Sequence, residues 1–154
     1  MPNVQLLCIG KLKEKYLQEA QSEYAKRLSA FCRLSIIEKK ESALPPGTSA
    51  ALVEKAVAEE SAALLAASRG ALIALSPEGQ RMTSEGFAAL VKKHEGDISF
   101  AVGGSNGLSG DIKSKAAHIV SFSDLTMPHQ LFRIVLLEQI YRAFMISSSR
   151  TYHK

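Results

Sequence analysis

Several signatures that would place a protein in a membrane or outside the cell are missing from this 154-residue sequence. No apolar run approaches the length of about 20 residues that a membrane-spanning helix needs. The first residues, MPNVQLLCIGKLKEK, lack the basic segment and the long apolar stretch of a secretory signal peptide. We therefore expect a cytoplasmic protein with no membrane partner.

Cysteine is scarce. The two cysteines, Cys8 and Cys32, each lie in an apolar or strand-like context, which is typical of small buried thiols. A disulfide is not expected in a reducing compartment. No cluster of Cys and His has the spacing of metal ligands, so the sequence predicts no zinc or other metal site.

The usual nucleotide-binding loops are absent as well. A dinucleotide fingerprint has the order Gly-x-Gly-x-x-Gly after the first strand, whereas Gly103, Gly104 and Gly107 follow a late strand in the order Gly-Gly-x-x-Gly. Asp124 follows Gly104 by 20 residues, as the fingerprint's acid would, which leaves a nucleotide-binding oxidoreductase as an alternative. The glycines alone predict a tight turn, or a backbone that a flat or bulky ligand approaches closely.

The composition is that of one soluble domain with no internal repeat, low-complexity segment or linker. Hydrophobic residues make up 46% and charged residues 22%, and the net charge is +4. Between residues 11 and 40, eight Lys and Arg residues stand against four Glu, and the C-terminal segment is also basic. Basic ends are weak support for an anionic partner, so a non-catalytic ribosome- or RNA-binding factor is a further alternative.

Apolar strands alternate with helical patterns along the whole chain. This alternation predicts an α/β fold, with a mostly parallel sheet and helices on both faces. The expected strands are residues 4–9, 33–38, 71–76 (closed by Pro77-Glu78-Gly79), 98–102 and 118–123. The expected helices are residues 16–28, 54–69 with a cap at Ser49, a helix from Thr83 or Ser84 to 94, 111–117 and 130–145.

Three of the strand ends are followed by segments that suit a ligand. Because parallel strands present their carboxyl ends at one edge, where ligands bind in open α/β sheets, we expect these segments to lie together. They are the segment at Leu75, the glycine pair Gly103-Gly104, and the loop from Ser123 to Pro128 with His129 beginning the next helix.

The last helix, residues 130–145, is apolar almost all round. Such a helix is buried in a core or in a subunit interface. Glu138 and Arg142 have the i,i+4 spacing of a helical ion pair. Arg142 is therefore either one member of that pair or a fixed cation for an anionic substrate.

The tail, residues 146–154, has the composition of a frayed terminus. It ends, however, in Tyr152, His153 and a lysine. These side chains can contact a nucleic acid or transfer a proton.

Taken together, these motifs resemble the RlmH (YbeA-like) family, the SPOUT-class ribosomal RNA large-subunit methyltransferases. The likeness rests on Gly103-Gly104-x-x-Gly107-Leu108, on SFSDLTMPHQLFRIVLLEQIYRAF and on the final YHK, and extends over the chain through CIGKLKEKY and EGQRMTSEGFA. It implies a single domain, residues 1–154, with a functional tail and a C-terminal trefoil knot. It also implies a homodimer that uses S-adenosylmethionine to methylate N3 of a pseudouridine in 23S rRNA of the ribosome. A SPOUT methyltransferase acting on another RNA remains an alternative.

The resemblance also implies two sets of site residues, with the tail of one protomer reaching the cofactor of the other. Asp124 matches a variable position of the family and is not expected to be essential. The cofactor-binding set is Leu75, Gly103, Gly104, Ser123, Asp124, Leu125, Thr126, Met127 and Pro128, and the catalytic set is His129, Arg142, Tyr152 and His153.

Overall fold

The computed structural model describes residues 1–152 and has the predicted alternation of strands and helices. All pairings in the five-stranded sheet are parallel, in the order β2-β1-β4-β3-β5, which confirms the α/β class. The elements are β1 (Asn3–Ile9), α1 (Lys15–Leu28), β2 (Arg33–Lys39), α2 (Ala50–Ala67), β3 (Ala71–Arg81), α3 (Ser84–Lys93), β4 (Asp97–Val102), α4 (Gly110–Lys115), β5 (His118–Ser121) and α5 (His129–Ser147).

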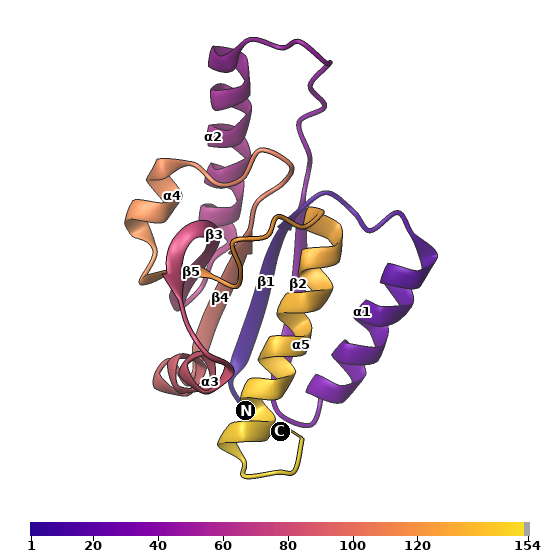
Figure 1. The fold of residues 1–154 in the computed structure, drawn as a ribbon, viewed down its shortest axis with the longest axis vertical. Coiled ribbons are helices and arrows are strands. Elements are labelled where there is room, and N and C mark those ends of the chain that lie inside the picture. The colour runs from indigo at the N-terminus through magenta and orange to yellow at the C-terminus, as the bar shows by residue number, and fades with distance from the viewer. Residues whose placement is uncertain (153–154) are drawn as a thin grey trace.

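The helices cover both faces of the sheet, with α1, α3 and α5 on one face and α2 and α4 on the other (Figure 1). The alternation of side chains along a strand explains the two layers. In β1, Leu6 and Cys8 pack with α5, whereas Leu7 and Ile9 belong to the cluster under α2 and α4. Within residues 1–152, none of the helices combines the length and apolarity needed to cross a bilayer.

Both cysteines are buried, as the sequence predicts. Cys8 is 1% exposed and Cys32 is 2% exposed. Burial raises the pKa of each thiol to about 11, so both remain protonated at neutral pH and behave as small apolar side chains.

The predicted caps begin their helices. The Ser49 hydroxyl accepts a hydrogen bond from the backbone N–H of Leu52, and Thr83 accepts one from Gly86. Because Ser49 caps α2 directly, this helix begins at Ala50, four residues before the stretch rich in helix-forming residues.

The prediction that Pro77-Glu78-Gly79 ends the third strand is also wrong, because β3 continues to Arg81. Val120 in β5 pairs both with Leu75 and with Gln80, so the intervening residues loop around the same point of β5. This loop passes very close to the strand, since a Cβ added to Gly79 would lie 2.7 Å from backbone atoms of Val120. Such a wrapping is consistent with the knot that the resemblance implies. β5 itself ends at Ser121, two residues before the predicted end.

Candidate functional site

The three predicted strand ends meet in one pocket of about 430 Å³ at the carboxyl edge of the sheet. This size is within the range of small-molecule and cofactor sites. Its walls come from the ends of β3 and β4 and from the loop after β5, and Phe122 and Phe132 form an apolar side. The sequence predicted only that the three segments lie at one edge of the sheet. The structure shows that they line the same pocket.

The glycine loop after β4 forms one wall and folds tightly onto itself. Gly107 donates a backbone hydrogen bond of 3.0 Å to the carbonyl of Gly104, and Gly107 has a φ of +79°. A Cβ added to Gly103 would lie 2.5 Å from the carbonyl carbon of Gly107. The closure of the loop is thus a sufficient reason for glycine at position 103, without any ligand.

Two side chains of α2 lie behind this glycine loop, and sequence reasoning missed both. The Ser61 hydroxyl accepts a hydrogen bond of 2.9 Å from the backbone N–H of Ser109, just past the loop. Glu60 accepts one of 2.9 Å from the N–H of Ser42, and its other oxygen lies behind Gly104. Glu60 is only 8% exposed. The sequence signal that could have identified it is an acid at a position where the helical pattern predicts a buried side chain.

The loop after β5 forms the opposite wall. Among the residues predicted to bind a cofactor, Leu75, Gly103 and Gly104 line the pocket together with four residues of this loop, Ser123, Leu125, Thr126 and Met127. Asp124 and Pro128 are not among the lining residues. The carboxylate of Asp124 instead forms an exposed ion pair of 2.5 Å with Arg81 at the end of β3.

An ion pair at the pocket was not predicted from the sequence. Glu78, in the loop of β3 around β5, binds the ammonium of Lys113 on α4, and both residues line the pocket. The Lys113 ammonium, followed by the Ser76 hydroxyl, lowers the pKa of Glu78 to about 2. The Glu78 carboxylate thus stays charged at neutral pH, beside the Lys113 ammonium in the pocket wall.

His129 also lines the pocket, at the first residue of α5. Its Nε2 atom is buried without a hydrogen-bond partner and lies 4.0 Å from the carboxylate of Glu41. His129 thus lines the pocket with a ring nitrogen whose hydrogen-bonding capacity is unused.

The other predicted catalytic residues lie elsewhere in the same chain. Arg142 is 13 residues further along α5, a separation of about 20 Å at 1.5 Å per residue. There the Glu138 carboxylate accepts hydrogen bonds from Arg142 Nε (3.2 Å) and Nη2 (2.9 Å) and from the Tyr152 hydroxyl (3.0 Å). Burial, and then the Glu138 carboxylate, raises the pKa of Tyr152. His153 lies outside the described residues.

Comparison with known proteins gives a match over nearly the whole chain. A family model described as "Predicted SPOUT methyltransferase" matches residues 2–153. The chain belongs to the SPOUT methyltransferase family. SPOUT relatives named "Ribosomal RNA large subunit methyltransferase H" include one from Streptococcus equi subsp. zooepidemicus, 44% identical over 98% of this chain and 99% of its own length. Another, from Leuconostoc mesenteroides, is 45% identical over 99% of both chains.

A solved structure supports the SPOUT fold. "The structure of a probable methylase family protein from Haemophilus influenzae Rd KW20" aligns with a TM-score of 0.60, covering 99% of this chain and 71% of that one. At 13% identity, this likeness concerns the fold alone.

The packing of Gly103 predicts a stability difference between two glycines. Gly103→Ala forces a Cβ against the backbone of Gly107 and should lower the free energy of unfolding by about 2 kcal/mol. Gly110→Ala is the matched control, because a Cβ there meets no atom within 4 Å. Chemical denaturation of both variants measures the effect, and equal stabilities would contradict the described packing.

Proposed function

We propose that this chain transfers a methyl group from S-adenosylmethionine to N3 of a pseudouridine in 23S rRNA of the ribosome. The observation that supports this most is the single pocket built from three strand ends in a member of the SPOUT methyltransferase family. The names of its relatives describe methyltransferases of large-subunit ribosomal RNA. These names support the assignment of ribosomal RNA as the substrate.

The pocket suits this cofactor chemically. Backbone groups of the glycine loop and of residues 123–127 offer N–H and C=O partners for an adenine and an amino acid, beside the apolar face of Phe122 and Phe132. We assign Leu75, Gly103 and Gly104 to one side of the cofactor and the loop after β5 to the other. S-adenosylmethionine, when bound, supplies a methyl group on a positively charged sulfonium.

The task of the protein is then to align N3 of the base and to remove its proton, because a protonated N3 is a poor nucleophile. Most of the rate comes from holding donor and acceptor in line. Arg142 stabilises the negative charge that develops on the base. His153 accepts the N3 proton or orients the base, as a histidine can at neutral pH, and His129 supplies a hydrogen bond at the pocket.

A homodimer completes this site. Because Arg142 and Tyr152 lie far from the pocket of their own chain, they reach a cofactor only if a second protomer places its pocket beside them. A second, smaller groove between α3 and α5 shares Phe122 and Met127 with the pocket and adds Val135 and Gln139 of α5. A partner seated along this groove would meet the pocket edge and α5 together.

The reaction is tested by mass spectrometry of 23S rRNA from cells with and without this gene. We expect one methylpseudouridine to disappear on deletion and to return on complementation. A methyl group lost from another nucleotide or another RNA would contradict the assigned substrate, and an unchanged RNA would contradict the methyltransferase activity.

A shared active site predicts rescue between two inactive variants. Gly104→Leu presses a side chain on Ile9 behind the glycine loop and so distorts the pocket wall. Arg142→Ala damages the cluster at Glu138, so each variant alone should lose activity. Co-expressed, the two chains form mixed dimers with one intact site, and random pairing in a two-fold dimer should restore about a quarter of the wild-type activity.

The matched control replaces the Arg142→Ala chain with one that carries both substitutions, which leaves no intact combination. Activity in this control, or no rescue when the single variants form mixed dimers, would contradict a site shared between protomers.

A further inference from the structure

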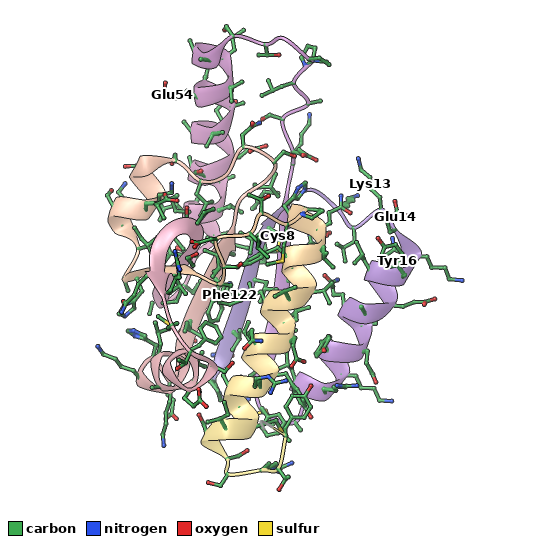
Figure 2. The ribbon with its side chains drawn as sticks, viewed as in Figure 1. Cys8, Lys13, Glu14, Tyr16, Glu54 and Phe122 are labelled. Carbon is green, nitrogen blue, oxygen red and sulfur yellow. The ribbon has the colours of Figure 1, made fainter. Side chains whose placement is uncertain are left out.

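A basic loop with an exposed aromatic ring lies between β1 and the first turn of α1. In residues 11–16, which we call the lysine loop, Lys11, Lys13 and Lys15 alternate with other residues and all three are exposed. Tyr16 is 67% exposed, and no other aromatic side chain among residues 1–152 is comparably exposed. Figure 2 shows Lys13, Glu14 and Tyr16 gathered at the outer end of α1, away from the sheet.

The lysine loop is held in place at several points, so it is not a loose connection. Arg133 donates a hydrogen bond of 3.0 Å to the carbonyl of Gly10, and Gln18 donates one of 2.8 Å to the carbonyl of Leu12. Leu12 itself is 7% exposed and anchors the middle of the loop. The lysines and the tyrosine are therefore presented on a fixed backbone.

The lysine loop also adjoins the pocket. The backbone N–H of Lys13 donates a hydrogen bond of 3.2 Å to Gln130 Oε1, and the neighbouring His129 lines the pocket. The end of β2 lies alongside, because Gly10 donates a hydrogen bond of 2.8 Å to the carbonyl of Lys39. The exposed Lys40 follows Lys39, which adds positive charge on the same side.

Nearby acids offset this charge only in part. The carboxylate of Glu41 lies beside Gly10 and 4.0 Å from His129 Nε2. Glu38 binds the buried guanidinium of Arg133. Lys15 lies 3.9 Å from Glu19, but both side chains are well exposed, and such pairs are worth little. Within the lysine loop itself, Glu14 is the one acid against three lysines.

We infer that the lysine loop is a contact site for single-stranded RNA, with Lys11 and Lys13 on phosphates and Tyr16 stacked on an unpaired base. The inference rests on the proposed function and names a surface for its substrate. Phosphates are bound by fixed cations, and unpaired bases stack on exposed aromatic rings. An acidic protein would account for the lysines but would give no role to the exposed ring.

The test measures methyl transfer by the full-length protein to ribosomes from the deletion strain, over a range of salt concentrations. Lys11→Gln/Lys13→Gln should raise the KM for ribosomes about tenfold and reduce the slope of log affinity against log salt by about 1.4, two phosphates at 0.7 each. Tyr16→Ala should raise the KM about tenfold, whereas Tyr16→Phe, which keeps the ring, should stay near wild type.

The affinity for S-adenosylmethionine and the kcat should not change in these variants, because none of the residues lines the pocket. The matched control is Lys55→Gln/Lys92→Gln, which removes the same charge from exposed positions on α2 and α3 and should leave the KM and the salt slope unchanged. Ultraviolet cross-linking of the wild-type complex, followed by peptide mass spectrometry, should find a nucleotide on residues 11–16.

Other results would overturn the inference. If wild-type protein methylates the ribosomes but the lysine-loop variants match the control pair, the loop does not bind the substrate. A cross-link from the loop to a ribosomal protein only would assign it to a protein partner, and a changed oligomeric state would assign it to the dimer interface. If wild-type protein methylates no ribosomes, the proposed function fails instead, a result that is distinct from the others.

Discussion

A single buried guanidinium connects the parts of the molecule that the proposed activity needs. Arg133, on the second turn of α5, is 1% exposed and binds Glu38 of β2 at 2.6 Å and the carbonyl of Gly10, after β1, at 3.0 Å. Breaking such a pair costs about 3–5 kcal/mol, because it leaves a charge buried without a partner. Arg133 thereby fixes the start of α5 over the carboxyl edge of the sheet, with His129 at the pocket on one side and the lysine loop on the other.

The rest of α5 leads away from that pocket to Arg142, which we propose acts on the substrate. Its first residue, His129, lines the pocket of its own chain. About three turns further on, Glu138 binds both Arg142 and Tyr152. In the proposed function, α5 thus separates the residue at the cofactor pocket from the residues that handle the substrate. The proposed two-fold dimer would bring the two ends of this helix together across its interface.

The sequence predicted the order of the elements and the three strand ends of the pocket, because periodicity and caps are local properties. It did not predict features that depend on contacts between distant segments. Three features are of this kind: the pairing of Glu78 with Lys113, the hydrogen bond from the Ser109 N–H to Ser61, and the burial of Arg133 in an apolar helix. The predicted end of β3 was wrong for the same reason. Pro77-Glu78-Gly79 has the local chemistry of a turn, and only the pairing with β5 keeps these residues in the strand.

The central claim is that one protomer binds the cofactor and the other supplies Arg142 and Tyr152. A crystal structure of the protein with S-adenosylhomocysteine, the unreactive product, tests it most directly. The ligand should lie between the glycine loop and residues 123–127, with Arg142 and Tyr152 of the second protomer beside it. A ligand bound elsewhere, or one approached by Arg142 of its own chain, would contradict the claim.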